Sequence, residues 1–253
     1  MDRLYAEHGT CVDLAFADPP YNLSKSYEGY TDDRKDAEYI QWCNEWLLRY
    51  VRLLKPNGSL FILNLPRWST HHAVFLSQHL YMQNWIVWDA LSDPRGKIMP
   101  AHYTLLHYTA HPTDFTLNPE AAVEPATRCL RAKCVKTRSP YLYRENLTNI
   151  WHDIHRIKHK RDRDQHPCQL PEKLLNRVIR MASNPNDVVL DCFMGTGTTA
   201  VVAQKLGRQY LGVENDPSYM DIAKRRLNQA HKPIISHDTL VIPTQLRLFA
   251  GID

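Results

Sequence analysis

The stretch from Val12 to Asn22 reads VDLAFADPPYN and decides the fold class. Its first six residues are mostly apolar, which is typical of a buried parallel strand. Two prolines then end the strand, because proline has no backbone N–H to donate to a neighbouring strand. Asp18 is therefore predicted to lie at the carboxyl end of this strand. In open α/β sheets ligands bind at that edge, so the sequence predicts an α/β fold with a site beside Asp18.

The residues after this strand suit one kind of substrate. Asp18 offers a carboxylate, Pro19 a carbonyl and Tyr21 a flat ring. An exocyclic amine of a nucleobase has two N–H groups and a planar ring, so it needs two acceptors and a surface for stacking. Acceptors that hold both hydrogens favour the more nucleophilic form of the amine, which can attack an electrophilic methyl group. Taken alone, the motif also fits a simple turn that ends a strand.

A second stretch, DVVLDCFMGTGTT at 187–199, has the pattern of a strand, a glycine turn and the start of a helix. The following YLGVE at 210–214 predicts another strand, which ends in Glu214. This acid lies nineteen residues after Gly195, close to the spacing at which an acid accepts ribose hydroxyls in nucleotide-binding units. The third glycine of a dinucleotide site and the lysine of a phosphate-binding loop are missing. The pattern indicates a nucleoside cofactor without phosphates.

Together these motifs resemble the S-adenosylmethionine-dependent DNA amino-methyltransferases, which methylate adenine N6 or cytosine N4. Asp-Pro-Pro-Tyr at 18–21 precedes Asp-x-Phe-x-Gly-x-Gly-Thr at 191–198, which is the β arrangement of this family. LKPNGSL at 54–60 and HPCQLP at 166–171 are further matches, and the resemblance covers about residues 10–110 and 165–230. It implies a Rossmann-like methyltransferase fold, with a mostly parallel central sheet, helices on both faces and an inserted target-recognition region.

The resemblance also implies roles for individual residues. Catalysis on a base flipped out of the duplex is assigned to Asp18, Pro19, Pro20 and Tyr21. Binding of S-adenosylmethionine is assigned to Asp191, Phe193, Gly195, Gly197, Thr198, Glu214, Asn215, His166 and Gln169. Cys168 and Leu170 depart from the threonine and lysine that are usual in the family, which weakens the assignment of single contacts in the segment 166–171.

The choice of base follows from family habit. Adenine N6 is favoured over cytosine N4, because Asp in the first position of the catalytic motif is commoner among the adenine enzymes. None of the six cysteines has an obvious nucleophile context, which argues against methylation of cytosine C5. The alternatives are a cytosine-N4 enzyme, an RNA methyltransferase, a protein glutamine methyltransferase and a DNA-binding relative without activity.

Positive charge is concentrated in one region. Residues 128–164 hold eleven Lys or Arg against four Asp or Glu, a net charge of +7, whereas the whole chain carries only +4. Such a cluster is the electrostatic footprint of a nucleic-acid contact, although a solvated basic surface also explains it. The predicted DNA-binding residues are Arg128, Arg131, Lys133, Lys136, Arg138, Arg156, Lys158, Lys160 and Arg161. Double-stranded DNA is the expected partner, and a cognate restriction endonuclease is a further one.

Cysteines and histidines in the same region raise the question of zinc. They are Cys129, Cys134, His152, His155 and His159. Four residues separate the two cysteines, a looser spacing than is usual in zinc sites. Phosphate contacts or an ordinary polar surface explain the histidines equally well, so no metal is expected.

We expect four regions: a catalytic half at 1–110, the basic target-recognition insertion at 111–165, a cofactor-binding half at 166–232 and a tail at 233–253. The chain has no long apolar run and no signal-peptide pattern, which favours a cytoplasmic protein of a bacterium or phage. In the tail, Gln245 to Phe249 resembles the peptide that docks on the replication sliding clamp, but a C-terminal strand is the alternative. The apolar strand begins so soon after Met1 that either the enzyme is compact or its true start lies upstream.

Periodicity predicts the remaining elements. Helices are expected at 37–54, 71–80, 172–181 and 219–230, and strands at 59–63, 85–88 and 103–108. The polar segment 23–35 shows no periodicity, so it is expected to be either an exposed loop or a lid that orders over cofactor and DNA.

Overall fold

The computed structural model describes residues 1–27, 30–90, 102–122, 148–157, 169–230 and 248–250. They form one eight-stranded sheet, in the order β10-β9-β8-β1-β4-β6-β5-β7, and a separate hairpin of β2 and β3. Strand β6 runs antiparallel to both of its neighbours, and the other seven strands share one direction. The bounds are β1 Val12–Ala17, β2 Lys25–Tyr27, β3 Tyr30–Asp32, β4 Leu54–Asn64, β5 Tyr81–Asp89, β6 His102–Thr109, β7 Ile150–Trp151, β8 Val188–Asp191, β9 Gln209–Glu214 and β10 Leu248–Ala250.

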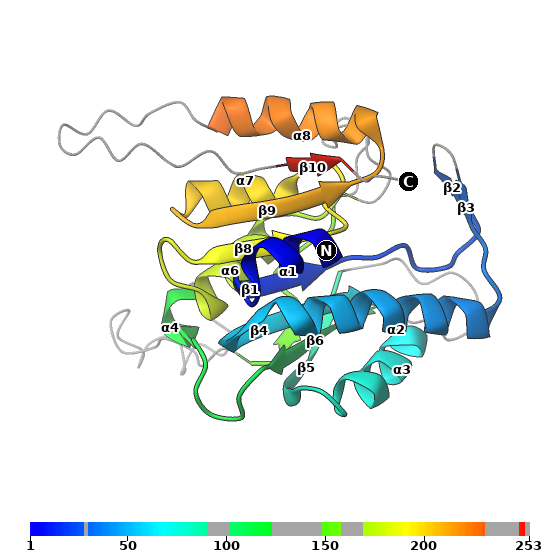
Figure 1. Cartoon of the computed structure of the whole chain (residues 1–253), viewed down its shortest axis with the longest axis horizontal. Coiled ribbons are helices and arrows are strands. Elements are labelled where there is room, and N and C mark those ends of the chain that lie inside the picture. Colours follow the sequence, from blue (N-terminus) through cyan, green and yellow to red (C-terminus); the bar gives the residue numbers. More distant parts are fainter. Residues whose placement is uncertain (28–29, 91–101, 123–147, 158–168, 231–247, 251–253) are drawn as a thin grey trace, which may run out of the picture.

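Helices cover both faces of the sheet (Figure 1), which confirms the predicted fold class. On one face lie α1 (Asp2–His8), α2 (Asp36–Leu53) and α3 (Pro66–Leu76), and on the other lie α6 (Glu172–Ala182) and α7 (Thr198–Lys205). Helix α4 (Pro119–Ala122) packs on α6, and α8 (Pro217–Ala230) packs on α7 and β9. Successive strand residues alternate between the two cores, so Phe16 of β1 faces α6 while Ala15 and Ala17 face α2. None of the described helices is both long and apolar enough to cross a membrane.

Most of the predicted helices and strands are present in the structure, with ends that differ by a few residues. Helices α2, α6 and α8 and strands β5 and β6 contain nearly all of the residues predicted for them. Strand β4 begins at Leu54, five residues earlier than expected. Val12 pairs with Leu54 but Leu14 pairs with Ser59, so residues 55–58 bulge out of the ladder. A side chain at Gly58 would place its Cβ only 2.9 Å from the Val12 carbonyl oxygen, which explains the glycine of this segment.

The structure corrects the bounds of one helix, shows a hairpin that was not predicted and pairs part of the tail with the sheet. Helix α3 spans Pro66–Leu76 rather than 71–80, because a proline at its first position starts the helix early. Within the segment 23–35, β2 and β3 pair as a short hairpin, which the sequence did not predict. At the C-terminal end, Leu248 and Phe249 pair with Gly212 and Val213 of β9, as in the strand alternative for the tail. Residues 245–247 lie outside the described residues, and docking on a sliding clamp stays a prediction.

The sheet places a crevice beside β1. The chain leaves β1 and returns to the sheet at β4, whereas it leaves β8 and returns at β9 on the opposite side. Strands β1 and β8 are themselves neighbours, with Phe16 opposite Asp191. The connections therefore diverge between these two strands, and such a switch point opens a crevice at the carboxyl ends of the strands.

Candidate active site

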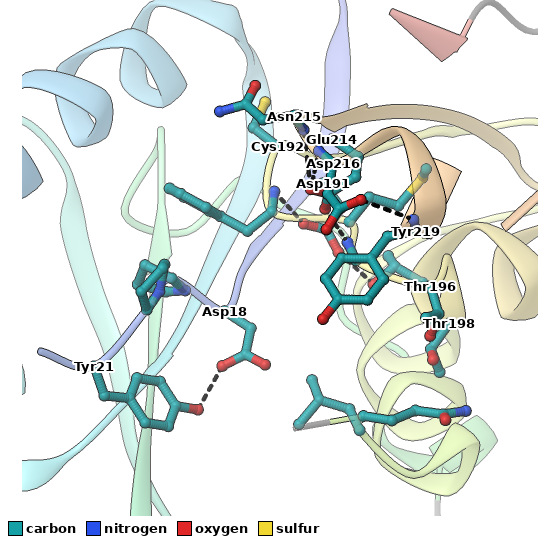
Figure 2. A pocket seen from close by; sticks show the side chains of 18 of the residues that line it. Asp18, Tyr21, Asp191, Cys192, Thr196, Thr198, Glu214, Asn215, Asp216 and Tyr219 are labelled. Atoms are coloured by element: carbon teal, nitrogen blue, oxygen red, sulfur yellow. Dashed lines mark hydrogen bonds between the residues drawn. The ribbon is translucent and has the colours of Figure 1, made fainter. Parts of the chain in front are cut away.

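A cavity of about 380 Å³ lies at the carboxyl ends of β1, β8 and β9. The motif from Asp18 to Tyr21 contributes one wall. The glycine turn after β8 and the residues from Glu214 onward contribute the opposite wall, as Figure 2 shows. The fold thus brings the two decisive motifs of the sequence to one site.

Asp18 is the central titratable group of the first wall. The Tyr21 hydroxyl donates a hydrogen bond to its Oδ1, and Figure 2 shows the second carboxylate oxygen on the side of the cavity. Burial disfavours the charged form and raises the pKa of Asp18 from 3.8 to about 7. The bond from Tyr21 and the charge of Lys25 lower this pKa, whereas the charge of Asp191 raises it further. Asp18 therefore changes its charge near neutral pH.

Two side chains that do not line the cavity donate hydrogen bonds to the backbone of the motif. The Tyr39 hydroxyl donates to the Pro20 carbonyl at 2.6 Å, and the Trp68 indole N–H donates to the Tyr21 carbonyl at 2.8 Å. No described residue donates a hydrogen bond to the carbonyl of Pro19, which belongs to the cavity lining. Among the described residues, the Pro19 carbonyl is thus the one carbonyl of Pro19, Pro20 and Tyr21 that accepts no hydrogen bond.

On the opposite wall, Glu214 ties the glycine turn to β9. Its Oε2 accepts from the Gly195 N–H at 2.7 Å, and its Oε1 accepts from the N–H groups of Asn215 and Asp216, both at 2.9 Å. Gly195 has a φ of 52° and Gly197 a φ of 81°, a backbone region that glycine adopts without strain. The turn therefore has a fixed shape and presents a carboxylate within it.

Asp191 supports this turn from below. Its Oδ1 accepts from the Phe193 N–H at 2.9 Å, and its Oδ2 accepts from the Thr199 hydroxyl at 2.6 Å. Burial raises the pKa of Asp191 to about 6, and the nearby charge of Glu214 adds to the effect. Both carboxylate oxygens thus accept hydrogen bonds from the protein itself. Asp191 therefore shapes the turn in addition to lining the cavity.

Most of the residues selected from the sequence line this cavity. They are Asp18, Pro19, Pro20, Tyr21, Gln169, Asp191, Phe193, Gly195, Thr198, Glu214 and Asn215. Gly197 is not among the lining residues; it begins α7 as its N-cap, and its Cα approaches Ala223 of α8 so closely that a Cβ would lie 2.8 Å from the Ala223 Cβ. His166 lies outside the described residues.

The sequence did not single out several other lining residues. Lys25 and Arg34 come from the segment around the hairpin, Trp42 from α2 and Tyr219 from α8. The Arg34 guanidinium lies 4.7 Å from the centre of the Trp42 ring, in a cation–π arrangement. A weak signal existed for Trp42, since this large aromatic side chain lies beside the apolar stripe of its helix and not within it. The irregular pattern of 23–35 gave no indication that Lys25 and Arg34 would line the cavity.

The basic insertion is described only in part. Of the nine predicted DNA-binding residues, Arg156 alone lies within the described ranges, and its Nε is buried without a partner there. Cys129, Cys134 and His159 lie outside those ranges. The part of the chain that the structure describes holds no group of three or more side chains suited to bind a metal ion.

Comparison with known proteins places the chain in a family. The N6/N4 family model, described as DNA methylase, matches residues 12–225. The Type II methyltransferase M.BamHI of Bacillus amyloliquefaciens is 37% identical over 230 residues, which are 87% of this chain and 53% of that protein. The DNA adenine methyltransferase YhdJ of Escherichia coli K12 is 35% identical over 233 residues, which are 87% of this chain and 77% of YhdJ.

The fold is similar to that of a solved structure, the putative DNA modification methylase TTHA0409 of Thermus thermophilus complexed with S-adenosyl-L-methionine. The TM-score is 0.66, at 21% identity, over 100% of this chain and 96% of the other. The chain spans only about half the length of M.BamHI but about three quarters of YhdJ. From the extent of the family match and the identity to these relatives, we conclude that the chain belongs to the N6/N4 family of DNA methylases.

Proposed function

We propose that the protein transfers a methyl group from S-adenosylmethionine to the exocyclic N6 of an adenine in DNA. One observation carries this proposal: a single cavity holds the amine-accepting motif from Asp18 to Tyr21 on one wall and the glycine turn with Glu214 on the other. A base inside a duplex is out of reach of such a cavity, so the adenine has to be flipped out at a cost of about a few kcal/mol.

The second wall fits a nucleoside cofactor. A carboxylate offers about four acceptor positions, and the three backbone N–H groups on Glu214 leave room for a ribose hydroxyl. Gly195 and Gly197 have positive φ values and add no side chains of their own to the turn. We assign cofactor binding to Glu214, Asn215 and the turn from Phe193 to Thr198, with Gln169 at the same cavity. When bound, S-adenosylmethionine supplies an electrophilic methyl group.

The first wall would activate the target. The ionised Asp18 carboxylate and the Pro19 carbonyl each accept one hydrogen of the amine, and the Tyr21 ring stacks on the base. Positioning and complementary charge then provide the catalysis, and no covalent intermediate with the protein is needed. The cavity also contains Cys192, but burial raises the pKa of its thiol to about 12, which disfavours the cysteine chemistry of C5 methylation.

Cytosine N4 is the second candidate target, because its amine needs the same two acceptors. The 35% identity to YhdJ, a DNA adenine methyltransferase, favours adenine. We assign the contact with the DNA backbone to the basic insertion, whose cations would neutralise phosphates.

The test is the transfer of tritiated methyl groups from S-adenosylmethionine to unmethylated bacterial DNA, followed by nuclease digestion and identification of the labelled nucleoside. We expect label in N6-methyladenine, and no label with the Asp18→Ala variant. Label in N4-methylcytosine would overturn the choice of base. No label in DNA while the cofactor still binds would overturn the proposed function.

A further inference from the structure

A chain of buried polar side chains lies behind the catalytic motif. The Tyr39 hydroxyl, from α2, donates to the Pro20 carbonyl at 2.6 Å. The Asn64 amide, at the end of β4, donates to the Tyr39 oxygen at 3.1 Å and lies 3.0 Å from Nε2 of His72 on α3. All three side chains are fully buried, and none of them lines the cavity. Side chains from three elements of the fold are thus linked in series to one carbonyl of the motif.

The direction of each hydrogen bond in this chain is determined. The Leu65 N–H donates to Oδ1 of Asn64 at 2.7 Å, which fixes the orientation of the amide. Nδ2 of Asn64 therefore points to Tyr39 and His72 and donates to both. His72 consequently accepts at Nε2 and carries its proton on Nδ1. Burial lowers the pKa of His72 to about 4, so the ring stays neutral at physiological pH.

This arrangement costs the fold stability. Nδ1 of His72 is buried and has no hydrogen-bond partner among the described residues. An unsatisfied buried N–H destabilises a protein, and an apolar side chain in the same place would avoid the loss. Local rules of this kind are broken mainly at functional sites. A role in holding the motif would explain these buried polar side chains, whereas packing alone would favour apolar ones.

We propose that Tyr39, Asn64 and His72 are positioning residues, which hold the Pro20 peptide so that the Pro19 carbonyl remains the acceptor for the target amine. Trp68 holds the next carbonyl, that of Tyr21, in the same way. A free Pro20 carbonyl would let the Pro19–Pro20 segment rotate and spoil the alignment of the amine. This inference rests on the proposed function and extends it to residues outside the cavity.

The test uses four variants of the full chain. Tyr39→Phe removes the donor to Pro20, and His72→Leu removes the acceptor of the second N–H of the Asn64 amide, so that this amide is no longer held between Tyr39 and His72. His72→Gln restores an acceptor oxygen near the position of Nε2. Tyr108→Phe is the matched control, because its hydroxyl also donates to a backbone carbonyl, that of Ala73 at 3.1 Å, from a buried side chain, but touches no part of the motif. For each variant, kcat and KM for DNA, the cofactor Kd and Tm are measured at a temperature well below Tm.

We expect kcat to fall about tenfold in Tyr39→Phe and His72→Leu, as for one lost hydrogen bond, while the cofactor Kd stays unchanged. His72→Gln should retain kcat within about twofold of the wild type, because it keeps an acceptor for the Asn64 amide that donates to Tyr39. Tyr108→Phe should also stay within about twofold, because it leaves the chain from His72 to Pro20 intact. Wild-type kcat in Tyr39→Phe and His72→Leu would refute the inference. So would an equal loss in Tyr108→Phe, or a failure of His72→Gln to restore activity in a folded protein. An inactive wild type would instead refute the proposed function.

Discussion

Replacing Tyr21 by phenylalanine removes one hydroxyl group from the active site and keeps the stacking ring. That hydroxyl donates to Asp18 and lowers its pKa, which burial has raised to about 7. A hydrogen bond to a charged group contributes about 1.5 kcal/mol, and one pKa unit corresponds to about 1.4 kcal/mol. The variant should therefore have an Asp18 pKa about one unit higher than the wild type.

The consequence is a shift of the pH profile. Asp18 accepts from the amine only when it is ionised, so activity rises with pH through its pKa. At pH 7 the ionised fraction falls from about one half to about one tenth, which predicts a roughly fivefold loss of activity in Tyr21→Phe. At about pH 9 the carboxyl is ionised in both proteins, and their activities should agree within about twofold.

The assay is kcat/KM for DNA between about pH 5.5 and 9.5 at saturating cofactor, since this ratio reports the pKa of groups in the enzyme before DNA binds. Tyr21→Ala provides the comparison, because it also removes the ring and should lose activity at every pH. An unchanged midpoint in Tyr21→Phe would refute the proposed role of the hydroxyl. A uniform loss across the pH range would show that the hydroxyl acts on something other than the ionisation of Asp18.

Asp18→Asn should stabilise the protein, because the folded state raises the pKa of Asp18 from 3.8 to about 7 and so binds the proton more tightly than the unfolded state. The penalty of the charged form grows between these pH values and is constant above them. In urea unfolding the gain should therefore be about 2.6 kcal/mol larger at pH 8 than at pH 5, and an equal gain would contradict this. Gly197→Ala should lower stability by about 2–4 kcal/mol, from its positive φ and the contact with Ala223, and an unchanged Tm would show that the turn relaxes. Cys192, with a pKa of about 12, should react with iodoacetamide at pH 8 at least about tenfold more slowly than a free thiol, as mass spectrometry of digests can check.

The sequence was most informative at the two places where an apolar run ends in residues suited to a binding site. An apolar run that ends at Asp18-Pro19-Pro20, and another that ends in a glycine turn, predicted two parallel strands with a site at their carboxyl ends. The structure confirms this because a strand without N–H groups must stop, and because parallel neighbours end at the same edge of the sheet. Glu214 was found by its spacing, since one βαβ unit has a nearly fixed length.

Other features depend on contacts between distant segments and left no periodic signal. The bulge at 55–58 follows from the approach of Gly58 to Val12, and the hairpin in 23–35 is too short for alternation to be visible. The polar chain behind the motif joins residues of α2, β4 and α3 that look ordinary in their own segments. Tyr39 resembles one more aromatic core residue in its helix, because burial alone does not reveal that its hydroxyl bonds to Pro20.

The division of the cavity into a cofactor wall and a substrate wall is the central claim, and calorimetric titration of S-adenosylmethionine into three proteins tests it most directly. Asp18→Asn should bind the cofactor within about twofold of the wild type, while Glu214→Gln should bind at least about tenfold more weakly, as for a lost charged hydrogen bond. Methyl transfer to DNA should be lost in Asp18→Asn despite its bound cofactor. Wild-type affinity in Glu214→Gln, or an equal loss of affinity in Asp18→Asn, would contradict the account.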